Sequence, residues 1–191
     1  MSLNYDIFIN CSELLIELHY HDPYTSQESI IIRYDNQYCV VKQYDHQYSS
    51  LLSVNSTFQK DSHSCILMGI NGPTGLHDHS YVIVDERIYI AVGNAVFCLS
   101  LPELSLVWSS ETDNATCFGI HYSRVHRCLI SHGELEISRL NMHGEIIWRT
   151  GGKDIFTGEM RIIDDRIEVE DFNDSIYSIS FHDGRSRILN G

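Results

Sequence analysis

The sequence lacks the features that would place the chain in a membrane or send it across one. No apolar run approaches the ~20 residues that a membrane-spanning helix needs. A secretory signal typically has a basic start followed by an apolar core, and the N-terminus of this sequence has neither. A cytoplasmic protein is therefore expected. The N-glycosylation sequons at Asn10, Asn55, Asn114 and Asn173 are interpreted as chance occurrences.

Basic residues are also scarce. The chain has 13 Lys and Arg against 26 Asp and Glu, a formal net charge of −13. This charge repels phosphate backbones and acidic headgroups, so neither nucleic acid nor a membrane surface is an expected partner. An acidic surface suits a basic protein partner or cations, and it also keeps a protein soluble without any partner.

Motifs of the common catalytic classes are missing. There is no Gly-x-Ser-x-Gly and no His-Glu-x-x-His, and the six cysteines form no C-x-x-C. Cys117 and His121 come nearest to a dyad, but two residues four apart on a strand are separated by ~13 Å. The glycine-rich run 69–75 lacks the Gly-Lys-Ser/Thr of a phosphate-binding loop and is predicted to be a turn. The chain is predicted not to be an enzyme, no cofactor is expected, and the cysteines are interpreted as small buried hydrophobic residues.

The most informative feature that is present is an internal repeat. Trp108 and Trp148 close similar segments, and 148 − 108 = 40 residues. Apolar segments that begin at Ile88, Cys128 and Ile167 keep nearly the same spacing. Four short strands in a unit of about 40 residues are typical of a propeller blade, whose sheet buries its faces by stacking on its neighbours. Each Trp is expected to fill the gap between adjacent sheets.

Turn residues divide each unit into expected strands. They are 80–84, 87–92, 95–101 and 104–109 in the first unit, and 115–121, 126–131, 134–140 and 145–150 in the second. The third unit, about 155–189, has turn residues in corresponding places but no convincing fourth strand. It is predicted to be a truncated blade.

These repeats resemble those of quinoprotein-like (PQQ-like) β-propellers over residues ~80–190. The similarity rests on the run Val-Phe-Cys-Leu-Ser-Leu followed by a turn and Leu-Val-Trp, and on Met-His-Gly-Glu-Ile-Ile-Trp over 142–148. The chain departs from the pattern where Pro102 and Glu103 replace the glycine turn, and where the third unit has no Trp. The resemblance implies a fold and not the cofactor, because the adjacent Cys-Cys pair of quinone-dependent members is missing.

Residues 1–79 lack the Trp but are rich in strand-forming segments. Expected strands are 6–11, 14–20, 30–34, 39–43 and 65–70, with a Ser-rich loop or linker over 45–64. The predicted fold is all-β: an N-terminal antiparallel sheet over 1–79 and three propeller-type repeats over 80–191, in one continuous globular unit that forms a small or incomplete propeller. A two-sheet β-sandwich is the alternative.

Two His-x-His pairs are the candidate metal ligands: His19 with His21, and His77 with His79. Alternate residues of a strand point to one face, so each pair can present two imidazoles to one metal. A site would need both pairs, or one pair and a carboxylate. With 11 histidines in the chain, chance pairs are also expected. A metal-binding protein or metal-dependent enzyme is the rival function.

Four tyrosines form the candidate recognition surface. Tyr34, Tyr38, Tyr44 and Tyr48 occur in a short duplication around 39–43. Tyrosine is enriched at interfaces, although such rings can also pack over the sheet edges of a β-domain. The expected function is a non-catalytic protein-interaction module that binds a partner or itself. An acidic inhibitor or immunity-type protein that masks a basic partner is a further alternative.

Overall fold

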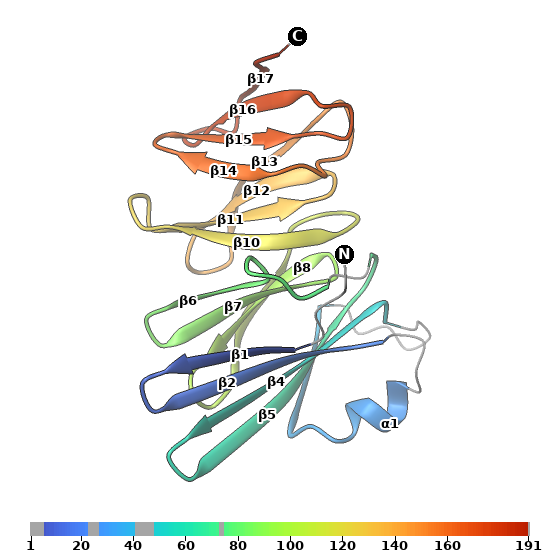
Figure 1. The fold of residues 1–191 in the computed structure, drawn as a ribbon, viewed down its shortest axis with the longest axis vertical. Coiled ribbons are helices and arrows are strands. Elements are labelled where there is room, and N and C mark those ends of the chain that lie inside the picture. Colours follow the sequence, from blue (N-terminus) through green and yellow to red (C-terminus); the bar gives the residue numbers. More distant parts are fainter. Residues whose placement is uncertain (1–5, 23–26, 41–47, 73–74, 191) are drawn as a thin grey trace.

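The structure is a computed structural model that describes residues 6–22, 27–40, 48–72 and 75–190. These residues form 17 strands and one short helix, α1 (Gln27–Ile31). The strands make four sheets that stack on one another (Figure 1). The all-β prediction is confirmed, and the four sheets rule out the two-sheet sandwich. No helix in the described part of the chain is long and apolar enough to span a membrane.

The first sheet has five strands in the order β1-β2-β4-β5-β3, and only the β3–β5 pair is parallel. Its strands are β1 (Asp6–Cys11), β2 (Leu14–His21), β3 (Asn36–Cys39), β4 (Ser50–Phe58) and β5 (Asp61–Gly69). The sheet lies at one end of the stack beside α1 (Figure 1).

The other three sheets are four-stranded antiparallel meanders whose spatial order follows the chain. The second sheet contains β6 (Tyr81–Val84), β7 (Arg87–Val92), β8 (Ala95–Ser100) and β9 (Leu106–Glu111). The third contains β10 (Cys117–Ser123), β11 (Cys128–Gly133), β12 (Glu136–Leu140) and β13 (Ile146–Gly151). The fourth contains β14 (Met160–Ile163), β15 (Arg166–Glu170), β16 (Ile176–Ser180) and β17 (Ser186–Ile188), and it lies at the far end of the stack (Figure 1). The predicted strands of the first two repeats are confirmed.

The hydrophobic core is divided among the gaps between the sheets, because successive residues of a strand point to opposite faces. In β7, Ile88 and Ile90 pack against the first sheet. Tyr89 and Ala91, which alternate with them, pack against the third sheet. A third cluster fills the gap between the third and fourth sheets. The inner strands are therefore buried on both faces, which explains their near-continuous apolar sequences.

The two tryptophans join neighbouring sheets, as predicted. Trp108 of β9 packs on the β12–β13 turn of the next sheet, where its Nε1 donates to the carbonyl of Met142 at 3.2 Å. A Cβ added at Gly144 would lie 2.6 Å from the Trp108 ring, and Gly144 has φ of +83°. Trp148 packs in the same way on Gly184, 40 residues after Gly144. The repeated glycine is thus required by the ring that covers it.

The first repeat departs from the glycine pattern because the preceding sheet supplies no Trp. Its turn, which includes Pro102, is instead bonded by smaller groups of the first sheet. The Tyr38 hydroxyl donates to the carbonyl of Leu104 at 3.1 Å, and the Ser56 hydroxyl donates to the carbonyl of Pro102. Without an indole to accommodate, the turn has no need of a glycine.

Four local predictions were wrong, and three of them are described first. The third repeat is a complete blade, because β17 supplies its fourth strand. This strand is only three residues long and largely exposed, so it carries no apolar alternation. The segment 30–34 is not a strand, since α1 begins at Gln27 and ends at Ile31. The segment 45–64 is not a loop throughout, because it contains β4 and the start of β5.

The serines of β4 explain the last error. Ser50, Ser53 and Ser56 are buried, and their hydroxyls are hydrogen-bonded to backbone carbonyls. A buried hydroxyl is tolerated when it has such a partner. The polar composition of β4 therefore led to the prediction of a loop where the structure has a central strand. The predicted strand 39–43 is instead β3, which ends at Cys39, and residues 41–47 lie outside the described part of the chain.

All six cysteines are free thiols. Four of them are buried in the cores between sheets, in agreement with the structural role predicted: Cys65, Cys98, Cys117 and Cys128. Burial raises the pKa of Cys65 to about 12, so this thiol stays protonated at neutral pH. Cys117 contacts the Ser131 hydroxyl at 3.1 Å.

Candidate functional site

The first strand of each four-stranded sheet is an edge strand, and three of these strands line one cavity. This first-strand cavity has a volume of about 410 Å³. It crosses the second, third and fourth sheets at β6, β10 and β14. Its lining residues are His79, Val82, Ile83, Ile120, His121, Tyr122, Arg124 and Ile162. The surface therefore exists only because the three sheets stack in this order.

A second, smaller cavity shares two of these residues, His79 and His121. It has a volume of about 180 Å³. We call it the histidine cavity because four imidazoles line it. Its lining residues are His77, His79, Gly119, His121, His132, Gly158, Glu159 and Met160.

Gly119 allows the segment that contains His77 and His79 to lie close to the backbone of β10. A Cβ at this position would lie 2.9 Å from the carbonyl oxygen of His79. That carbonyl accepts a hydrogen bond from the amide of Ile120 at 2.8 Å. His77 fixes the segment further, since its Nε2 lies 2.7 Å from the carbonyl of Phe118 and its Nδ1 lies 3.2 Å from the amide of His79. His77 therefore donates through Nε2 and accepts through Nδ1, which sets its tautomer.

The other two imidazoles come from neighbouring strands. Gly119 of β10 is paired with His132 of β11. His121, two residues after Gly119, lies on the same face of the sheet. The rings of His79 and His121 are neighbours, with centroids 4.3 Å apart and a tilt of 30° between their planes. The Nε2 of His132 is buried and has no hydrogen-bond partner among the described residues.

The environment keeps these imidazoles uncharged. Burial, with a smaller effect of the neighbouring histidines, lowers the pKa of His121 to about 3. Burial also lowers the pKa of His132 to about 4, although a hydrogen bond with the backbone of Phe156 opposes the shift. Both rings are neutral at pH 7, so they offer lone pairs and no positive charge.

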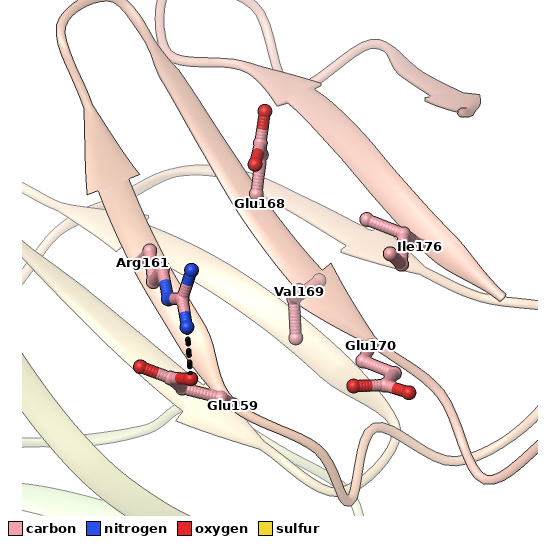
Figure 2. Close-up of a pocket in the computed structure, with 6 residues that line it drawn as sticks. All are labelled: Glu159, Arg161, Glu168, Val169, Glu170 and Ile176. Atoms are coloured by element: carbon pink, nitrogen blue, oxygen red, sulfur yellow. Dashed lines mark hydrogen bonds and ion pairs between the residues drawn. The ribbon is translucent and has the colours of Figure 1, made fainter. Parts of the chain in front are cut away.

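Glu159 connects the histidine cavity to a third cavity on the fourth sheet. Glu159 is paired with Arg161, with 2.5 Å between carboxylate oxygen and guanidinium nitrogen. Figure 2 shows this pair together with Glu168 and Glu170, which line the same cavity. The hydrogen bond from Arg161 lowers the pKa of Glu159. This third cavity has a volume of about 160 Å³ and is lined by three carboxylates, of which Glu168 is paired with Arg166. Of the three, only Glu159 also lines the histidine cavity.

The predicted four-histidine metal site is divided between two places. His77 and His79 line the histidine cavity, and neither His19 nor His21 does. His21 instead contacts the Tyr34 hydroxyl and the Ser53 hydroxyl, each at 3.0 Å. Within the described ranges, no three His, Cys, Asp or Glu side chains are already placed to hold a metal ion. Metal binding stays a prediction.

The candidate tyrosines do not gather in one patch in the described residues. Tyr34 and Tyr48 are partly buried against a small cluster that includes Leu51. Tyr38 packs against the core between the first and second sheets. Tyr44 lies outside the described residues. The three described rings have packing roles, and partner binding through the tyrosines stays a prediction.

Sequence reasoning found the His77–His79 segment but did not connect it with the residues that face it, although His121 was considered beside Cys117. His121, His132 and Glu159 lie 42 to 80 positions further along the chain (121 − 79 and 159 − 79), and nothing in their local sequence marks them. One usable signal was present. Gly119 interrupts a strand-forming segment, and a glycine inside a strand often marks the close approach of another backbone.

Comparisons with known proteins give the fold and no family. No protein-family model matches the sequence, and no curated protein matches it. The chain is similar in structure to the WD40 β-propeller domain of Doa1, with a TM-score of 0.54 and 14% identity. It is also similar to BamB from Moraxella catarrhalis, with a TM-score of 0.55 and 13% identity. The match covers 99% of this chain in both cases, but only 54% of the Doa1 domain and 62% of BamB.

A europium-containing methanol dehydrogenase gives a lower TM-score of 0.46 at 15% identity, over 63% of this chain and 25% of that chain. At these identities the likeness is one of fold alone. The predicted resemblance to propeller repeats is confirmed at that level. The Doa1 domain and BamB match this chain over nearly all of its length, but the chain spans only about half to three fifths of theirs.

Proposed function

We propose that this chain is a non-catalytic protein-interaction module, and that it binds its partner at the first-strand cavity. The observation that carries the proposal is the cavity itself. It joins the first strands of three consecutive sheets in one concave surface of about 410 Å³. In a closed propeller the blades surround a central channel. In the described residues, the first and fourth sheets lie at opposite ends of the stack (Figure 1).

The composition of the cavity supports recognition of a protein. Ile83 and Ile162 supply partly exposed apolar area, while Tyr122 and Arg124 supply the residue types that are enriched at interfaces. The three contributing strands are edge strands. The outer backbone edge of such a strand is unpaired within its own sheet, and a free stretch of it is suited to accept a segment of another chain. On β10 the amides of Cys117 and Ile120 already donate to the carbonyls of Gly93 and His79.

The charge of the chain supports a basic partner. The formal net charge is −13, and Glu170 lies on the fourth sheet beside the ion pairs Glu159–Arg161 and Glu168–Arg166. Complementary charge speeds association and disfavours acidic partners. An acidic inhibitor or immunity-type protein that masks a basic enzyme is a special case of the same proposal.

A comparison of two surface variants tests the proposal. The double variant Tyr122→Ser with Arg124→Glu changes the first-strand cavity. Val107→Ser is the matched control, because Val107 is exposed on β9, at the opposite edge of the second sheet. Each protein is used to capture partners from the native host, and bound proteins are quantified by mass spectrometry. The proposal predicts a partner whose recovery falls at least tenfold with the double variant and is unchanged with the control. Equal recovery with all three proteins would contradict it.

A further inference from the structure

We propose that the histidine cavity is a binding site for a divalent transition-metal ion, with His79, His121 and His132 as imidazole ligands and Glu159 as a carboxylate ligand. The inference does not depend on the protein-interaction function. It also differs from the site predicted from the sequence, because three of its four ligands lie outside the two His-x-His pairs. Two features of the cavity support the site: the donor atoms that are available and the space between them.

The four imidazoles of the cavity are not equivalent. Both ring nitrogens of His77 are engaged with the backbone, at Phe118 and at His79, so His77 acts as a support for the segment. His132 is the opposite case, because its buried Nε2 has no partner among the described residues. A buried acceptor without a partner is costly, and such an atom needs an explanation. A bound cation would supply the missing partner.

The kinds of donor atom at the site also suit a metal. Glu159 lies at the rim of the same cavity, where its carboxylate is now paired with Arg161. Three imidazoles and one carboxylate form a donor set that suits zinc, nickel and copper, and that calcium and magnesium do not favour.

The present arrangement requires a small rearrangement for binding. The rings of His79 and His121 are tilted by 30° with centroids 4.3 Å apart, and no three donors in the described part of the chain already converge. Each ring would have to turn so that one nitrogen points into the cavity of about 180 Å³. Gly119 and Gly158 line this space and add no side chains to it. His79 is exposed, so its ring has room to turn.

The proposed ligands would connect three sheets. His79 precedes β6 of the second sheet, His121 and His132 belong to the third, and Glu159 precedes β14 of the fourth. An ion held by all four would therefore oppose separation of these sheets. Because a ligand that binds only the folded state stabilises it, zinc should raise the melting temperature.

Isothermal titration calorimetry of the full chain, prepared without a histidine tag, tests the site with zinc chloride at pH 7.5. The expected result is one zinc per chain. His132→Gln and His79→Gln should each weaken binding at least tenfold and remove the rise in melting temperature. His143→Gln is the matched control, since His143 is exposed and does not line the cavity. The double variant His19→Gln with His21→Gln is also expected to bind zinc normally.

Circular dichroism checks that each variant is folded. If His132→Gln does not fold, Glu159→Gln and His79→Gln still test the site, because both residues are exposed. Absence of zinc binding would overturn the proposal. So would zinc binding that survives in both His79→Gln and Glu159→Gln, or that is lost in the His19 and His21 double variant. None of these outcomes changes the partner-capture result, so the two proposals fail independently.

Discussion

Replacing Gly144 by alanine tests how the sheets are joined. The added methyl carbon would lie 2.6 and 2.7 Å from two carbons of the Trp108 ring, so the indole has to move. The residue has φ of +83°, a conformation that alanine adopts only with strain. Strain of about 1 kcal/mol and overpacking of about 1 to 3 kcal/mol give an expected loss of roughly 2 to 4 kcal/mol in the free energy of unfolding.

Urea denaturation followed by tryptophan fluorescence measures this loss. Gly151→Ala is the matched control, because a Cβ there would come no closer than 3.3 Å to its nearest neighbour, the Leu135 carbonyl oxygen, and no positive φ is involved. We expect the control to change stability by less than about 0.5 kcal/mol.

A double-mutant cycle separates the two causes. In a Trp108→Leu background the ring is absent, so Gly144→Ala should cost only the backbone strain, about 1 kcal/mol. If Gly144→Ala lowers the free energy of unfolding equally in both backgrounds, the Trp108 ring is not the reason for glycine at this position. The explanation of the repeated Trp and Gly would then be wrong.

Three further predictions follow from single groups. Gly119→Ala places a carbon 2.9 Å from a backbone carbonyl oxygen of the segment before β6, so it should destabilise the protein by about 1 to 3 kcal/mol in the same denaturation assay and weaken zinc binding. The pKa of His121 is about 3 and that of His132 about 4 in the folded state, both below the ordinary value of 6.5. The unfolded chain therefore binds more protons as pH falls below about 6.5, and each group should cost roughly 2 kcal/mol of stability by pH 5. Urea titrations at pH 7.5 and pH 5 that give equal stability would contradict this. Tyr38→Phe removes the hydrogen bond to Leu104 at 3.1 Å, and a loss of about 1 kcal/mol is expected from thermal or urea unfolding.

The repeat architecture could be predicted from the sequence because its determinants are local. Buried strands have apolar sequences, and turn residues mark the hairpins between them. Trp108 and Trp148 are separated by the same number of residues as the two glycines that they cover. The first sheet was less predictable. The buried serines of β4 look like loop residues, and they reside in a strand because tertiary hydrogen bonds satisfy their hydroxyls.

The site could be predicted only in part. His77 and His79 attract attention as a pair, whereas His121 and His132 are brought together by strand register and by stacking of the sheets. Register across a hairpin depends on the turn and on which face is buried, so one strand alone does not reveal it. The first-strand cavity is formed by three sheets together, so the sequence of a single repeat does not indicate it.

Hydrogen exchange of the captured complex is the most direct test of the proposed binding surface. Amide exchange would be compared for the chain alone and for the chain with its partner bound. The account predicts added protection in β6, β10 and β14, with no change in β9, β13 and β17 at the opposite edges of the same sheets. Protection confined to those opposite edges, or to the first sheet and its tyrosines, would show that the partner binds elsewhere.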